Sequence, residues 1–231
     1  MSIHSKIVGS VGHLILDRTE KANAYDRAHL EALDAAIQSV EARCSVLLIR
    51  SAHSTVFCAG ADLDEMKSAT PEDAARLYSQ SVFTRLSRST LVSVALVEGF
   101  AIGGGCELAL AADIRIVGQS ARFRLPETSL GIIPAAGGCT RLTALLGPSI
   151  AKQAILAGAE ISAHQAIGWG LAIDGSPDPM STALRLCETL SQRSPEALYA
   201  AKRIIDSYAE DASLQEEREA QSKLYAQRNQ Q

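Results

Sequence analysis

A carboxylate that follows three glycines is the first feature of the sequence that indicates chemistry. In the segment FAIGGGCELALAADI, residues 100–114, Glu107 stands two positions after Gly105 in a run of apolar helix formers. A helix that is apolar nearly all round is expected to be buried, and an ionised carboxylate there costs several kcal/mol unless it is paired or hydrogen-bonded. Glu107 is therefore either one half of a buried ion pair with an arginine or a functional acid.

The glycines before this acid favour the functional interpretation. Gly103, Gly104 and Gly105 allow a ligand to approach the backbone closely, and the first N–H groups of a helix have no partner within the helix. The positive end of the helix dipole adds to their attraction for negative charge. Unpaired amides and a buried acid within one helical turn indicate acid–base chemistry on a group that develops negative charge on oxygen.

A second stretch with small residues follows an earlier predicted strand. In STVFCAGADLDEM, residues 54–66, Ala59, Gly60 and Ala61 permit close backbone approach, and Asp62 can cap whatever follows. A purely structural turn explains this stretch equally well when it is taken alone.

A third stretch contains another acid. In ARFRLPETSLGIIPAAGGCTRL, residues 121–142, Glu127 follows Pro126. Taken alone, it is a carboxylate at a helix start, which stabilises the helix by a few tenths of a kcal/mol. Arg124, three positions earlier, either lowers the pKa of Glu127, binds a polar substrate, or faces outward from the surface, and we favour the outward position.

The elements that must position these residues are those of an α/β chain. Short apolar runs predict strands over HLILD (13–17), SVLLIRS (45–51), LVSVALVEG (91–99) and DIRIVG (113–118). An amphipathic helix is expected after Asp26, its N-cap, and another from Pro71 in the segment PEDAARLYSQSVFTRLSRS. Strand signals fade after about Gly147, so we expect a helical C-terminal region.

Composition excludes several classes of function. The 231 residues carry a formal net charge of −4, and the Lys and Arg residues are scattered, so no basic stripe for nucleic acid is present. No stretch approaches about eighteen uninterrupted apolar residues, and the N-terminus lacks the pattern of a signal peptide. We therefore expect a cytoplasmic protein that binds neither nucleic acid nor membrane.

The cysteines are expected to be reduced thiols that pack in the interior. They are five in number, widely spaced, and without a C-x-x-C pair: Cys44, Cys58, Cys106, Cys139 and Cys187. A nucleophilic role for Cys58 or Cys106 is the less favoured alternative.

Taken together and in this order, the stretches resemble the enoyl-CoA hydratase/isomerase, or crotonase, family. The matching blocks are FCAGADLDEM, VEGFAIGGGCELALAADIRI, FRLPETSLGIIPAAGGCTRL and AGAEISAHQAIGWGL. The resemblance runs from about His13 to the final helices, and the interval from Glu107 to Glu127 is kept.

The resemblance implies a mechanism and assigns residues to it. In this family two backbone N–H groups hold the thioester oxygen of an acyl-CoA, and these positions are similar to Ala61 and Gly104. Hydratases of the family use two glutamates around one water, matched here by Glu107 and Glu127, whereas isomerases generally keep only the counterpart of Glu127. The resemblance therefore implies reversible hydration of a trans-2-enoyl-CoA to a 3-hydroxyacyl-CoA.

The same resemblance assigns the binding of CoA and substrate. The implied residues are Lys21, Ala59, Ala61, Asp62, Leu63, Asp64 and Gly104. Lys21 stands where the family often has a basic residue near the CoA phosphates, although an exposed loop lysine is more often only solvated. No metal or cofactor is implied, because the thioester is the electron sink and CoA is part of the substrate.

The fold implied is a spiral of ββα units followed by a helical region used for trimer formation. We expect an α/β core with the CoA and catalytic site over residues 1–147 and a helical region for oligomerisation and pocket cover over 148–231. The implied assembly is a homotrimer or a dimer of trimers, and the last helix of the family pattern is expected to be missing or short. The alternatives are isomerisation, thioester hydrolysis or C–C cleavage on the same oxyanion hole, and a non-catalytic acyl-CoA-binding protein.

Overall fold

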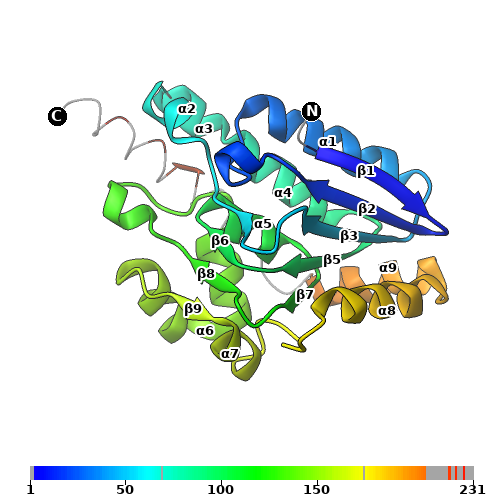
Figure 1. Ribbon diagram of the computed structural model, residues 1–231. Coiled ribbons are helices and arrows are strands. Elements are labelled where there is room, and N and C mark those ends of the chain that lie inside the picture. Colours follow the sequence, from blue (N-terminus) through cyan, green and yellow to red (C-terminus); the bar gives the residue numbers. More distant parts are fainter. Residues whose placement is uncertain are drawn as a thin grey trace.

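Two β-sheets lie at the centre of the molecule (Figure 1). The computed structural model describes residues 3–68, 70–173 and 175–206, together with residues 218, 219, 222 and 226. The larger sheet has the order β1 (Ile3–Val8), β2 (Val11–Leu16), β3 (Val46–Ser51), β5 (Val92–Val97) and β7 (Ile114–Val117). The smaller sheet has the order β4 (Val56–Cys58), β6 (Phe100–Ile102), β8 (Arg122–Arg124) and β9 (Ile161–Ser162).

The chain builds both sheets at once by repeating one unit. Each repeat adds a strand to the larger sheet, then a strand to the smaller sheet, and then one or more helices. The three units begin with β3–β4, β5–β6 and β7–β8, and both sets of strands are parallel. The helices that follow are α2 (Leu63–Ser68), α3 (Pro71–Arg76) and α4 (Tyr78–Arg88) in the first unit, α5 (Gly104–Ala111) in the second, and η2 (Glu127–Leu130) with α6 (Gly138–Leu156) in the third. This is the spiral of ββα units that the resemblance implies.

Both faces of the larger sheet are covered. In β3, Leu47 and Ile49 pack in the core beneath α1 (Arg27–Glu41) and α4, whereas Val46 and Leu48 pack with residues of α8 (Pro179–Ser191). Figure 1 shows α8 and α9 (Pro195–Asp206) on one side of this sheet and α1 on the other. A strand buried on both faces reads as a continuous apolar run, which is why SVLLIRS was recognisable as a strand.

The predicted elements of the core are present. The four predicted strands correspond to β2, β3, β5 and β7, and Asp26 caps α1 by accepting a hydrogen bond of 3.0 Å from His29 N–H. The sequence did not indicate β1, β4, β6, β8 and β9, most of which have only two or three residues. Strands of two or three residues are too short to show an alternation of apolar and polar side chains.

The single helix expected from Pro71 is wrong in one respect, because it is broken into α3 and α4. Leu77, between them, has φ 28°, and its N–H bonds to the Asp73 carbonyl as the last bond of α3. Leucine does not favour positive φ, so no sequence signal marks this break. The break brings Leu77 and Ser79 into the wall of a cavity described below.

The C-terminal region is mostly helical where it is described. Helix α6 has a kink at Gly147, β9 pairs with β8, and α7 (Ala163–Gly168), α8 and α9 follow. The helices expected after Asp206 lie almost entirely outside the described residues. The division at residue 147 stays a prediction.

A buried ion pair attaches α9 to the larger sheet. The Lys202 ammonium lies 2.9 Å from Asp113 Oδ2 and donates to the Leu91 carbonyl at 2.9 Å. Asp113 Oδ2 also accepts from the Ser93 N–H and hydroxyl at 2.7 and 2.8 Å. Removing one partner of such a pair leaves the other charge buried and unpaired, which is costly.

We predict that Lys202→Met lowers the free energy of unfolding by about 2–4 kcal/mol, because Asp113 loses its cation. Urea denaturation checks this, with Lys152→Met on the exposed side of α6 as the matched control. Equal stability of the two variants would mean that the ion pair does not hold α9 to the sheet.

Candidate active site

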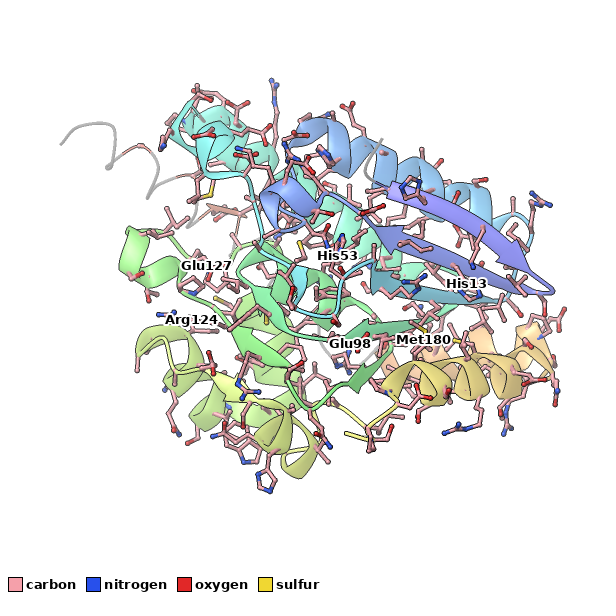
Figure 2. All side chains as sticks on the ribbon, in the orientation of Figure 1. His13, His53, Glu98, Arg124, Glu127 and Met180 are labelled. Carbon is pink, nitrogen blue, oxygen red and sulfur yellow. The ribbon has the colours of Figure 1, made fainter. Side chains whose placement is uncertain are left out.

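A cavity of about 620 Å³ opens where the loop after β4, the start of α5 and η2 meet. A cavity of this size is typical of a small-molecule site. Its lining contains every residue that the sequence nominated for the site: Lys21, Ala59, Ala61, Asp62, Leu63, Asp64, Gly104, Glu107 and Glu127. In Figure 2, Glu127 lies well apart from three other labelled residues near the larger sheet: His13 in β2, Glu98 just after β5 and Met180 in α8.

The loop after β4 and the first turn of α5 approach more closely than side chains allow. Gly60 has φ +92°, and a Cβ added there would lie 2.8 Å from the Ile102 carbonyl oxygen and 3.1 Å from the Gly104 nitrogen. A Cβ added at Gly105 would overlap the Cys58 carbonyl. Glycine at these positions lets two backbone segments lie side by side at the cavity wall.

Two backbone N–H groups face this junction. Tyr25 N–H donates to the Gly60 carbonyl and the Tyr25 carbonyl accepts from Asp62 N–H, both at 2.8 Å. This parallel bridge uses the groups on either side of Ala61, so the N–H of Ala61 points away from Tyr25. Gly104 is the first residue of α5, so its N–H has no acceptor within the helix. The arrangement suits an oxygen that carries negative charge.

Glu107 is buried on α5 and reaches the start of another helix. Its Oε1 accepts a hydrogen bond of 2.8 Å from the N–H of Gly138, the first residue of α6. A Cβ added at Gly138 would lie 3.0 Å from that oxygen, so glycine permits the contact. A helix N-terminus stabilises a carboxylate in its charged form.

Glu127 is buried in a different environment at the start of η2. Its Oε2 is buried and has no hydrogen-bond partner among the described residues. Burial raises the pKa of Glu127 to about 7, so about half of this acid keeps its proton near neutral pH, where an ordinary carboxyl group is fully ionised. A Cβ added at Gly103 would lie 2.9 Å from Glu127 Oε1, and Gly103 is held by its N–H bond of 2.8 Å to the Arg124 carbonyl.

The two acids therefore lie in different surroundings. Glu107 accepts from a helix N-terminus, which favours the carboxylate, whereas Glu127 is desolvated, which favours the carboxylic acid. Environments that separate two carboxyl groups in this way are typical of a base and an acid that act together. The wall of the cavity thus holds two carboxyl groups in unlike surroundings, together with Ala61 and Gly104.

Charged residues form the rim of the cavity. Lys21 Nζ lies 3.1 Å from Asp64 Oδ2 and 3.5 Å from Asp62 Oδ2, and Lys67 Nζ lies 3.3 Å from Asp64 Oδ1. Hydrogen bonding to Asp64 raises the pKa of Lys21 and keeps it cationic. A phosphate group at Lys21 would have to compete with these aspartates. Lys67 is not among the residues nominated from the sequence, although it stands one helical turn after Asp64.

Apolar residues line another part of the cavity, and the sequence nominated none of them. They come from α2, the α3–α4 break, the last residue of η2 and the segment that follows it: Met66, Leu77, Leu130, Ile132 and Ile133. Tyr25 also lines the cavity and was missed. In the sequence, the one signal for Tyr25 is its position just before the helix cap Asp26. Its bridge to Ala61 is seen only in the structure.

Other reactive side chains lie outside this cavity lining. Burial raises the pKa of Cys58 to about 12 and that of Cys106 well above its usual value, which suits packing thiols and not nucleophiles. His53 lies by Asp17, and His29 Nδ1 is 2.6 Å from Asp26 Oδ1. Arg124 is exposed, in agreement with the outward position.

No cluster of three His, Cys, Asp or Glu side chains that could hold a metal ion occurs within the described residues. In the same part of the chain, no helix combines the length and the apolar character needed to cross a bilayer.

Comparison with known proteins settles the family. The sequence pattern of the enoyl-CoA hydratase/isomerase family matches residues 6–231. The chain belongs to this family. Its crotonase resemblance and its ββα spiral are thereby confirmed, since solved enoyl-CoA hydratases have the same fold.

Several curated relatives are hydratases by name. The chain is 38% identical to a probable mitochondrial enoyl-CoA hydratase 2 of Arabidopsis thaliana over 198 residues, which are 83% of this chain and 65% of that protein. It is 37% identical to the 2,3-dehydroadipyl-CoA hydratase of Escherichia coli (89% and 83% covered) and 35% identical to the short-chain-enoyl-CoA hydratase of Clostridium acetobutylicum (86% and 78%). The chain thus spans just under two thirds of the plant relative.

Solved structures agree with these relatives. An enoyl-CoA hydratase from Bacillus anthracis superposes with a TM-score of 0.85 at 30% identity, covering 99% of this chain and 92% of the other. The enoyl-CoA hydratase from Thermoplasma volcanium GSS1 also gives 0.85 at 30% identity, covering 98% and 91%. These findings support an enzyme of the enoyl-CoA hydratase type that acts on acyl-CoA.

We predict that the stability of the protein depends on pH through Glu127. Its pKa is raised by folding, so the stabilisation it provides is complete below its unfolded value and is lost as pH rises through about 7. Relative to Glu127→Gln, the wild type should therefore lose about 2 kcal/mol of unfolding free energy between about pH 5 and about pH 8.

Urea denaturation at the two pH values measures this difference. The exposed Glu72→Gln is the control and should parallel the wild type. If Glu127→Gln also parallels the wild type, Glu127 ionises as an ordinary carboxylate and the acid assignment loses its basis.

Proposed function

We propose that the protein catalyses the reversible addition of water to a trans-2-enoyl-CoA, giving a 3-hydroxyacyl-CoA. The observation that carries this proposal is the pair of unlike carboxyl groups, Glu107 and Glu127, in the wall of one cavity with the amides of Ala61 and Gly104. Hydration needs a base for water, an acid for carbon and a site for the negative oxygen. The hydratase names of several relatives support the same reaction.

Each group has one task in the forward direction. Glu107 accepts a proton from water as the water oxygen bonds to the β-carbon, and the electrons of the double bond move onto the thioester oxygen. The amides of Ala61 and Gly104 stabilise that enolate oxygen, and one such donor is typically worth about 3–4 kcal/mol of barrier. Glu127 then delivers its proton to the α-carbon, and the thioester carbonyl is restored. Transfer of the proton from Glu107 back to Glu127 returns the site to its starting state.

The binding of CoA is assigned to the rim and the loop after β4. We propose that backbone groups from Ala59 to Asp64 hold the adenine and pantetheine parts, and that Lys21 contacts a phosphate. Because Asp62 and Asp64 already neutralise Lys21, its contribution to affinity should be modest. The reaction needs neither metal nor organic cofactor, since the thioester accepts the electrons and the amides stabilise them.

The resemblance to the family carries the remaining expectations. We expect a homotrimer or a dimer of trimers, a cytoplasmic location, and a place in fatty-acid or related acyl-CoA metabolism. The mitochondrial name of one relative makes the location the expectation to check by fractionation.

We predict that Glu107→Gln and Glu127→Gln each lower kcat on crotonyl-CoA by about 10²–10⁴-fold, because each removes one proton transfer. The measurement is the loss of the conjugated enoyl-thioester absorbance. Glu98→Gln is the matched control, since Glu98 is partly buried and its pKa is raised by burial, but it lies outside the cavity lining.

Other outcomes identify other reactions. If only Glu127→Gln abolishes turnover, and a 3-enoyl-CoA is converted to the 2-enoyl isomer, the protein is an isomerase. If free CoA thiol is released, it is a thioesterase. Tight binding of acyl-CoA with no turnover of any of these substrates would overturn the enzymatic proposal in favour of a binding protein.

A further inference from the structure

A phenol lies at the reacting end of the cavity, next to the candidate oxyanion amides. Tyr25 lines the cavity, and its backbone forms the bridge that orients the loop containing Ala61. None of the steps proposed above uses its hydroxyl group.

The Tyr25 hydroxyl lies directly against the first residue of α5. A Cβ added at Gly104 would overlap Tyr25 Oη, and it would also lie 2.7 Å from Cζ and 3.0 Å from Cε1. Gly104 and Glu107 stand three residues apart on α5 and share a helix face, so the hydroxyl borders both. The absence of a side chain at Gly104 is what allows the phenol to reach this position.

The ring of Tyr25 has a fixed position. Its centroid lies 5.8 Å from that of Phe83 on α4, with the two planes at 88°, an edge-to-face contact. Phe83 is fully buried in the core. An edge-to-face pair favours this orientation of the ring, which places the hydroxyl beside Gly104.

The hydroxyl is a donor over the whole working pH range. Burial, and after it the charge of Glu107, raise the pKa of Tyr25 well above its usual value. A hydrogen bond with the Ser79 side chain lowers this pKa, but by less than burial raises it. A neutral phenol beside an oxygen that gains negative charge is a strong hydrogen-bond donor.

We propose that Tyr25 Oη donates a hydrogen bond to the same substrate oxygen that the Gly104 N–H binds, as a third donor of the oxyanion site. An oxygen at about 3 Å from the Gly104 nitrogen lies within reach of a hydroxyl that contacts Gly104 itself. The inference rests on the proposed function in taking that oxygen to be the thioester oxygen. No covalent step is added, because the donor only stabilises the enolate.

Tyr25→Phe tests the proposal, since it removes the hydroxyl and keeps the ring against Phe83. The matched control is Tyr78→Phe, whose ring lies under Arg27 at 3.6 Å and is outside the cavity lining. The unfolding midpoint of Tyr78→Phe should equal that of the wild type, and that of Tyr25→Phe should fall only slightly, because this variant also loses the hydrogen bond with the Ser79 side chain. On crotonyl-CoA, Tyr25→Phe should lower kcat by about 10–100-fold with KM changed less than about threefold.

A second measurement reads the same hydrogen bond without turnover. Acetoacetyl-CoA ionises to an enolate with its own near-ultraviolet absorbance, so a pH titration of the protein-bound ligand gives its enolate fraction. Tyr25→Phe should reduce the ratio of enolate to keto form about tenfold at fixed pH, and Tyr78→Phe should not.

The outcomes separate this inference from the proposed function. If Tyr25→Phe leaves kcat and the enolate ratio unchanged, or only raises KM, Tyr25 merely shapes the cavity and the inference is overturned. If the wild type hydrates no enoyl-CoA but the enolate ratio still depends on the Tyr25 hydroxyl, the hydratase proposal fails and the third donor stands. Failure of the wild type to bind acetoacetyl-CoA would overturn both.

Discussion

The contact between the loop after β4 and the first turn of α5 is the constraint on which the site depends. Gly60 and Gly105 let these two backbone segments approach closer than any Cβ would permit. The contact brings Gly60, the residue before Ala61, close to the Gly104 nitrogen, so Ala61 and Gly104 line the same cavity although they are far apart in the sequence. The repeated ββα unit makes this contact possible. The strands β4 and β6 are parallel neighbours, so the segments that follow them leave the smaller sheet at the same end of its strands.

The same geometry gives the two acids their different characters. Glu107 is one turn into α5 and meets the N-terminus of α6, whereas Glu127 is enclosed at the start of η2 with one oxygen unpartnered among the described residues. Neither environment is a property of the glutamate itself. Gly103 and Gly138 leave room for the two carboxyl groups, so the backbone that forms the helices also shapes the surroundings of both acids.

Much of this could be predicted from the sequence, and the omissions have physical causes. The buried strands β2, β3, β5 and β7 are continuous apolar runs, and the Asp26 cap is a local signal. All the site residues that were nominated from the family motifs line one cavity. Leu77 was missed because a positive φ at leucine has no sequence signature, and Tyr25 because its role depends on a glycine far along the chain.

The most direct test of the account is a crystal structure with 3-hydroxybutyryl-CoA bound. We expect the thioester oxygen to lie about 3 Å from both the Ala61 and the Gly104 nitrogen. We also expect the 3-hydroxyl group to lie within hydrogen-bonding distance of Glu107 and the α-carbon to face Glu127. A thioester oxygen bound away from these two amides, or a 3-hydroxyl group distant from Glu107, would contradict these expectations.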